Sequence, residues 1–180
     1  MTPTDSELIA RAQTIQDRAA FGELVRRHQS AVRRFLRHLI GGDDALADDL
    51  AQETFIQAWR SLERYRGDAL FSTWLLGIAH NHARNARRRK RPAAPVDMPE
   101  AADESAPSPA QAAELSQDLE TALGELSPQE QTALHLCYQQ GLSHSEISAV
   151  LGWPLGTVKT SIARSKERLR KLLAAWNPQP

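Results

Sequence analysis

Polar side chains between positions 81 and 88 are of types that contact nucleic acid in proteins. Four of them recur at offsets of three, four and seven, so a helix would carry them on one face: Asn81, Arg84, Asn85 and Arg88. Asparagine amides can read base edges, while arginine guanidinium groups hold phosphates. A solvated helix face explains the two arginines equally well. Asparagine, however, is a poor helix former, and nothing in the helix pattern requires two of them.

A second polar set lies near the C-terminus, within a helix-turn-helix pattern. Residues 141–159 predict a short helix, a Gly-x-Pro-x-Gly turn and the start of a second helix. The apolar residues that can pack between the two helices are Ile147, Leu151, Val158, Ile162 and Leu169. The side chains left near the face that would enter a major groove are Thr157, Thr160, Ser161, Arg164 and Arg168. The alternatives are a packed helical hairpin with a solvated basic face, a response-regulator output domain or a simple repressor.

Charge is unevenly distributed along the chain, although the formal net charge is +0 at pH 7. Six of the eight residues from 84 to 91 are Lys or Arg, whereas residues 92–158 contain ten acids and no Lys or Arg. Residues 159–171 then contain six cations and a single acid. This pattern favours two phosphate-contacting sites, which the acidic middle can shield when nucleic acid is absent.

The polar set at 81–88 must be positioned by helices of the N-terminal half. One-faced apolar spacing predicts a helix over 17–40, and the glycines that follow it are a stop signal. Asp43 or Asp44 can cap a second helix that runs to about Leu62.

The remaining N-terminal elements follow from similar signals. A shorter helix is predicted over 6–15, and residues 66–68 predict a loop. Ser72 can cap a third long helix that ends in the basic run. Its aromatic residues Phe71 and Trp74 are expected in the core rather than stacked on bases.

A linker separates the two halves. Five prolines lie among Ala, Ser, Asp and Glu over 92–111, a composition that cannot offset the loss of chain entropy on folding. Beyond it, capping boxes predict helix starts at 127–130 and 143–146. Because no alternating strand pattern is present, the chain is predicted to be all-α. Two small helical domains, at 1–91 and 112–176, are joined by a flexible acidic linker over 92–111.

The residues provide little for catalysis. No Gly-rich phosphate loop or nucleophile–base pair is visible, and His80 and His82 would point to different sides of a helix rather than share a metal. The single cysteine, Cys137, excludes an internal disulfide framework, and its apolar surroundings favour a buried hydrophobe over a redox sensor. We therefore expect no enzymatic activity, metal, cofactor or small-molecule substrate.

The sequence also predicts where the protein works. No apolar run approaches the roughly 20 residues that span a bilayer, and the N-terminus lacks the layout of a signal peptide. A cytoplasmic location is the expectation.

Three segments resemble the extracytoplasmic-function (ECF) subfamily of bacterial sigma-70 factors. Residues 48–60 (DDLAQETFIQAWR) and 65–81 (YRGDALFSTWLLGIAHN) resemble sigma region 2, and residues 141–159 (GLSHSEISAVLGWPLGTVK) resemble sigma region 4. Their order, the linker and the absence of a middle domain also match. The resemblance implies a sigma factor that binds core RNA polymerase and directs promoter-specific initiation. A free-standing helix-turn-helix regulator is the alternative.

The resemblance implies a polymerase-binding surface on the acidic helix. Its residues would dock on the clamp helices of the largest polymerase subunit: Asp48, Asp49, Gln52, Glu53 and Phe55. The alternatives are that the two aspartates only complement the positive end of their own helix, and that Phe55 belongs to the core, which we favour for this residue.

The resemblance also implies the promoter contacts. A loop that captures a flipped base of the minus-ten element, together with the helix after it, would supply Tyr65, Arg66, Gly67, Asp68, Asn81, Arg84, Asn85 and Arg88. The helix-turn-helix would read the minus-thirty-five duplex through Thr157, Lys159, Thr160, Ser161, Arg164 and Arg168. The partners implied are core RNA polymerase (including the flap of its second-largest subunit), promoter DNA and an anti-sigma factor.

Overall fold

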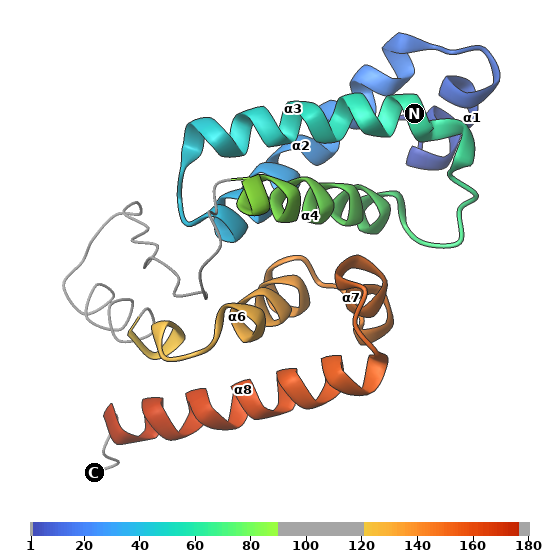
Figure 1. The fold of residues 1–180 in the computed structure, drawn as a ribbon. Helices are drawn as coiled ribbons and strands as arrows, with labels where there is room; N and C mark the ends of the chain where they lie inside the picture. Colours follow the sequence, from blue (N-terminus) through green and yellow to red (C-terminus); the bar gives the residue numbers. More distant parts are fainter. Residues whose placement is uncertain (1, 90–120, 177–180) are drawn as a thin grey trace. The chain divides into compact units, whose positions relative to one another are not determined.

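Helices account for the regular structure of the chain. The computed structural model describes residues 2–89 and 121–176, and these contain helices and turns but no strand (Figure 1). The chain forms two compact units, the first built from helices α1 to α4 and the second from α6, α8 and most of α7. The all-α prediction is confirmed. The linker predicted at 92–111 lies outside the described residues.

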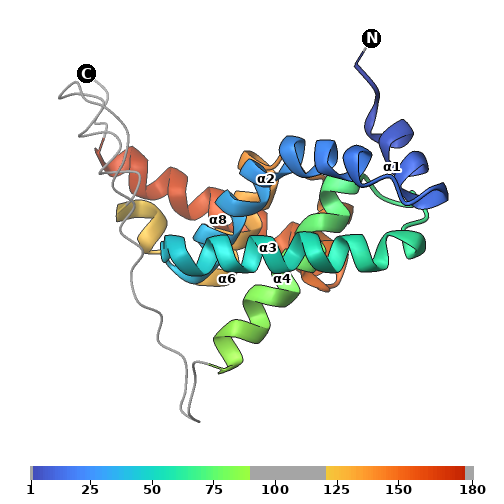
Figure 2. The ribbon, with the colours of Figure 1, turned by 90° about the horizontal axis from the view of Figure 1, so that it is seen from above.

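Three long helices dominate the first unit. Its elements, in chain order, are α1 (Asp5–Thr14), α2 (Arg18–Ile40), α3 (Asp44–Ser61), the short 3-10 helix η1 (Leu62–Arg64) and α4 (Phe71–Arg89). Helices α2, α3 and α4 each pack against the other two, and α1 packs against α2 (Figure 2). The long helices thus form a three-helix bundle to which α1 is added.

The core of the first unit lies where the long helices meet. Phe35 and Leu36 of α2 and Leu75 of α4 have no exposed surface. Burial of each such side chain contributes about 1.5–3 kcal/mol to folding. The exposed face of α4 is therefore held on a rigid support.

Short polar residues and a glycine set the helix ends: the Asp43 cap and the glycine stop are as predicted, and the Asp17 cap was not predicted. The Asp17 carboxylate accepts two backbone N–H bonds at the start of α2, and Asp43 accepts the N–H of Leu46 at the start of α3. Gly41 ends α2 in the left-handed conformation, with φ of 75°.

The start of α4 differs from the prediction. The helix begins at Phe71, and the backbone N–H of Trp74 already donates to the carbonyl of Leu70. Ser72 is therefore inside the first turn and does not cap the helix. The preceding loop, rather than a local cap signal, fixes where this helix begins.

The second unit contains the helix-turn-helix. Its elements are α6 (Pro128–Leu134), the π-helical turn η2 (His135–Gln139), α7 (His144–Leu151) and α8 (Leu155–Trp176). Both predicted capping boxes are present, from Ser127 to Glu130 and from Ser143 to Glu146. The π-helical turn, in which the N–H of Gln140 donates to the carbonyl of His135, was not predicted.

The predicted burial of the apolar residues of α7 and α8 is largely confirmed, and α8 packs mainly against α6. Ile147 and Val158 have no exposed surface, Leu151 and Ile162 are buried, and only Leu169 is half-buried. Gly152 ends α7 with φ of 70°, which turns the chain toward α8.

Candidate nucleic-acid and protein interfaces

The structure brings the four polar residues of α4 to one exposed face. Asn81, Arg84, Asn85 and Arg88 are all exposed, whereas Ala79 and Ala83 on the opposite side of the helix are buried. We call these four residues the α4 face. Its amides and guanidinium groups can approach bases and phosphates without unpacking the bundle.

Arginines supply the positive charge at this end of α4. A shallow pocket of about 180 Å³ is lined by Leu39, His80, Ala83, Arg84, Arg87 and Arg88. Burial and the charges of Arg84 and Arg87 lower the pKa of His80. Burial and the charge of Arg87 likewise lower the pKa of His38, on α2, to about 4. Both imidazoles are therefore neutral at pH 7.

Only part of the loop before α4 is exposed to solvent. Arg66, Gly67 and Asp68 are exposed, and Gly67 adopts a φ of 79° that other residues rarely take. Leu70 is 67% exposed, which is unusual for a leucine beside a bundle. The exposure of Leu70 could not be predicted from apolar periodicity, because loop residues follow no helical repeat. An apolar side chain at this position can pack against an unstacked base.

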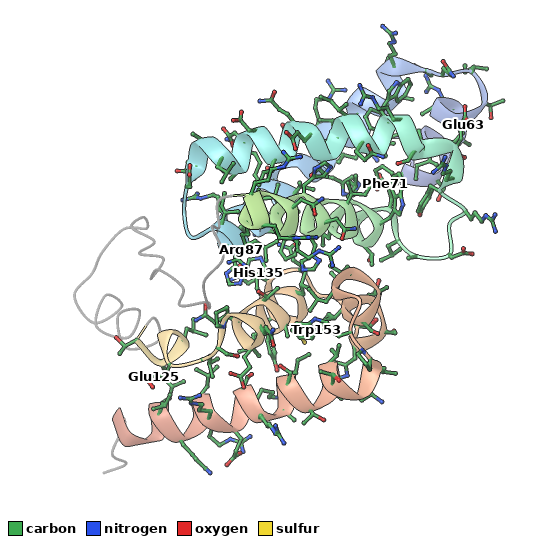
Figure 3. The ribbon with its side chains drawn as sticks, in the orientation of Figure 1. Glu63, Phe71, Arg87, Glu125, His135 and Trp153 are labelled. Carbon is green, nitrogen blue, oxygen red and sulfur yellow. The ribbon has the colours of Figure 1, made fainter. Side chains whose placement is uncertain are left out.

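Tyr65 is already engaged within the loop. Its hydroxyl donates to the carbonyl of Ala69 at 2.6 Å, and its ring lies against Phe71 and Trp74 with centroid separations of 5.5 and 5.2 Å. Figure 3 shows Phe71 at the start of α4, inside the unit. Burial, followed by the carboxylates of Asp5 and Asp68, raises the pKa of Tyr65, so the hydroxyl remains a donor. Tyr65 therefore shapes the loop.

The outer face of α3 carries the residues predicted to bind polymerase. Asp49, Gln52 and Glu53 are exposed, and Glu53 Oε2 lies 3.2 Å from His82 Nδ1 of α4. Ile56 follows at an offset of seven from Asp49 and is 51% exposed. Ile56 was not predicted as a binding residue, because an isoleucine on this helix is expected in the core. We call these four residues the α3 face.

Two of the predicted polymerase-binding residues differ from the rest. Asp48 is paired with Arg33 of α2, with Nε to Oδ1 at 2.6 Å and Nη2 to Oδ2 at 2.7 Å. Phe55 is 9% exposed and lies with the core residues of α3, as the alternative interpretation expected.

Five of the six residues predicted to read the minus-thirty-five duplex lie on one side of α8. Thr157, Thr160, Arg164 and Arg168 are exposed and Ser161 is half-buried, at spacings that keep the five on one face. We call these five residues the α8 face. Lys159 is exposed too, but two residues along a helix is a rotation of about 200°, so Lys159 lies on the far side from Thr157.

Hydrogen bonds within α8 occupy some of its hydroxyls. The Thr160 hydroxyl donates to the Gly156 carbonyl at 2.8 Å, which restricts the rotamer of this exposed side chain. Arg168 Nη2 lies 3.5 Å from Glu125 Oε2, a residue labelled in Figure 3. Because both partners are exposed, DNA phosphate can replace this ion pair.

Three further features concern metal binding, the single cysteine and membrane insertion. Within 2–89 and 121–176, no three His, Cys, Asp or Glu side chains come together as a metal site would need. Cys137 is half-buried in the π-helical turn. Among the helices in the described part of the chain, none is both long and apolar enough to cross a membrane.

Comparison with known families matches both units. The family model for sigma-70 region 2 matches residues 24–93, and that for sigma-70 region 4 matches residues 116–169. The chain is 35% identical over 182 residues to the RNA polymerase sigma-H factor of Pseudomonas aeruginosa, covering 94% of this chain and 93% of that protein. It is also 38% identical to the ECF RNA polymerase sigma factor SigE of Mycolicibacterium smegmatis, covering 86% of this chain and spanning 62% of that relative's length.

Two solved structures are similar to this chain. CnrH, solved in complex with the cytosolic domain of CnrY, is 30% identical with a TM-score of 0.67, over 95% of this chain and 97% of that one. The sigma factor RpoE of Bartonella quintana, solved with the anti-sigma factor NepR, shares the fold at 24% identity and a TM-score of 0.64, over 85% of this chain and 96% of that one. The two matched regions, in their order along the chain, and the relative that is 35% identical over nearly its whole length establish that the chain belongs to the ECF subfamily of sigma-70 RNA polymerase sigma factors.

Proposed function

We propose that this chain is a sigma factor that brings core RNA polymerase to promoters and opens them, without catalytic activity of its own. The observation that carries the proposal is the presence of two exposed polar faces, on α4 and on α8, each supported by its own buried core. Two separate DNA-binding faces match a promoter with two separate recognition elements. Assembly with polymerase would place the protein in the cytoplasm.

The first unit acts on the minus-ten element. Its exposed loop residues, Arg66 to Asp68, and Leu70 lie just before α4, the helix that carries the α4 face. Arginines neutralise the phosphates of the separated strand, and the asparagine amides and the loop receive unstacked bases. Tyr65 contributes by holding the loop rather than by stacking on a base.

The α3 face docks on the clamp helices of the largest polymerase subunit. Asp49 and Glu53 provide negative charge, and Ile56 provides an apolar centre between polar neighbours. Interfaces with a desolvated apolar anchor and a polar rim are typical of specific complexes. The carboxylate of Asp48 contributes less, because Arg33 neutralises it.

The second unit reads the minus-thirty-five element as duplex. The helix-turn-helix places α8 in the major groove, where the α8 face offers hydroxyl groups and guanidinium groups to base edges and phosphates. We infer that Lys159, on another side of the helix, contacts a flanking phosphate. The polymerase flap holds this unit at the correct distance from the first.

A protein inhibitor is part of the proposal. Two solved relatives with the same fold are described in complex with an anti-sigma factor or with a cytosolic domain of another protein. An anti-sigma factor that covers the α3 face would keep polymerase away from this chain.

Transcription in vitro tests the proposal. Purified core RNA polymerase is incubated with a genomic fragment library, with and without the protein, and transcript starts are sequenced. We expect new starts that share a two-part upstream motif, and we expect Arg164→Ala to weaken use of the upstream part. If no starts appear and the protein binds duplex DNA without polymerase, the free-standing regulator becomes the better account.

A further inference from the structure

The loop from Tyr65 to Leu70 is held from outside its own sequence. Gln13 of α1 is half-buried, and its Nε2 donates to the carbonyl of Leu62 and to the carbonyl of Tyr65, both at 2.9 Å. An amide nitrogen has two hydrogens, so both are used. The two carbonyls belong to the last turn before the loop and to its first residue.

Tyr65 connects the Gln13 contact to the far end of the loop. Its main-chain carbonyl is held by Gln13, and its side-chain hydroxyl holds the carbonyl of Ala69. Its backbone N–H also donates to Leu62. Both ends of the exposed segment 66–68 are therefore fixed by one residue that depends on Gln13.

Helix α1 is itself fastened to α2 at both ends. Asp5 lies 2.6 Å from His28 Nε2 and 3.0 Å from Arg27 Nη1, and Arg11 pairs with Asp17 at 2.6 Å. A side chain on α1 therefore has a defined position relative to the bundle. The position of Gln13 follows from these contacts.

We propose that Gln13 is a positioning residue for promoter recognition: its forked amide sets the shape in which the loop receives a base of the minus-ten element. This inference rests on the proposed function of the loop. Gln13 acts through the carbonyls of Leu62 and Tyr65, so its loss changes which base the loop prefers rather than whether the unit folds.

The second unit contains a matched control. Gln131 makes the same fork, with Nε2 donating to the carbonyls of Leu123 and Leu126 at 2.9 and 3.1 Å. It is also half-buried. Gln131→Glu therefore removes an equivalent pair of hydrogen bonds. The residue is buried to a similar degree and is distant in sequence from the loop.

The experiment measures base selectivity in the reconstituted holoenzyme. Open-complex formation is followed on a promoter with its best minus-ten element and on versions with each position of that element changed. The quantity compared is the ratio of rates between best and changed elements, because a smaller folded fraction scales both rates equally. The variants are Gln13→Glu, Gln13→Ala and Gln131→Glu, and Gln13→Ala provides the test if the glutamate is not tolerated.

We expect both Gln13 variants to lower the selectivity ratio at one minus-ten position by about fivefold, a change of the size that two lost hydrogen bonds can cause. Gln131→Glu should leave that ratio at the wild-type value. If the Gln13 variants keep the wild-type ratio, or change no more than Gln131→Glu does, the inference is wrong. If Arg66→Ala also keeps the wild-type ratio at every position, the loop reads no base, and the proposed function of the loop fails as well.

Discussion

Arg33 of α2 and Asp48 of α3 form a two-point ion pair, with Nε to Oδ1 at 2.6 Å and Nη2 to Oδ2 at 2.7 Å. The two side chains remain about half exposed, at 51% and 42%. An exposed pair of this kind adds little to stability. Its effect is to cancel the charge of one carboxylate on a helix where Asp49 and Glu53 keep theirs.

This pair predicts an asymmetry between neighbouring aspartates. Asp49→Ala should weaken binding to core polymerase several-fold in a fluorescence anisotropy titration. Asp48→Ala should also weaken binding, because it leaves the Arg33 cation unpaired beside a basic partner surface. The double variant Arg33→Ala/Asp48→Ala should recover most of that loss, whereas adding Arg33→Ala to Asp49→Ala should not. Equal affinities for Asp48→Ala and the double variant would contradict the prediction.

The exposed isoleucine of α3 is expected to act as a binding anchor. Ile56→Ala should weaken core polymerase binding by about 1 kcal/mol or more, yet leave the melting temperature unchanged because alanine suits an exposed helix position. Ile15→Ala is the control, since Ile15 is 70% exposed at the end of α1 and lies outside the α3 face. A similar loss of affinity for both variants would show that Ile56 has no special role.

The arrangement of α8 predicts unequal contributions from its cations. Arg164 lies on the α8 face, and Lys159 does not. Arg164→Ala should lower use of the minus-thirty-five element and relax its sequence preference, with a cost of about 1–3 kcal/mol if the side chain contacts a base edge. Lys159→Ala should weaken binding equally for all sequences and reduce its salt dependence. Transcription from promoter variants at two salt concentrations separates these outcomes.

His38 predicts a loss of stability in mild acid. Burial and the charge of Arg87 lower its pKa from 6.5 to about 4. The folded state therefore binds this proton less readily than the unfolded chain. Stability from this group is complete above pH 6.5 and is lost as the pH falls toward 4. At pH 5 the loss is up to about 2 kcal/mol.

Urea unfolding at pH 7 and pH 5 measures this effect. His38→Gln should show a smaller difference between the two pH values than the wild-type protein. The comparison cancels contributions from other groups, including Asp5, whose salt-bridged carboxylate titrates at lower pH. An unchanged difference in the variant would show that another group is responsible.

Local signals made much of the fold predictable. Asp43 and the two capping boxes act within three or four residues of sequence, and all of them form as predicted. The apolar spacing of Ile147 and Val158 likewise predicted their burial. Each of these features depends on side chains that are close in the chain.

Features that depend on distant partners were not predictable in the same way. Ser72 has a suitable type for a cap, but α4 begins at Phe71, after a loop that contains the Tyr65 to Ala69 hydrogen bond. The bond from Gln13 to Tyr65 spans 52 residues, and the Arg33 to Asp48 pair joins two helices. Exposure of Ile56 could not be read from its type, because isoleucine is usually buried.

The way the loop is anchored also affects how such a protein can change over generations. Its end points are fixed by Gln13, Tyr65 and the carbonyl of Ala69, while residues 66–68 are exposed and make no bond that the bundle depends on. Arg66 and Asp68 can therefore change at little cost to folding, whereas the positive φ of Gly67 disfavours any other residue there. Duplicated copies of the gene could acquire different promoter preferences through this short segment while keeping one stable scaffold.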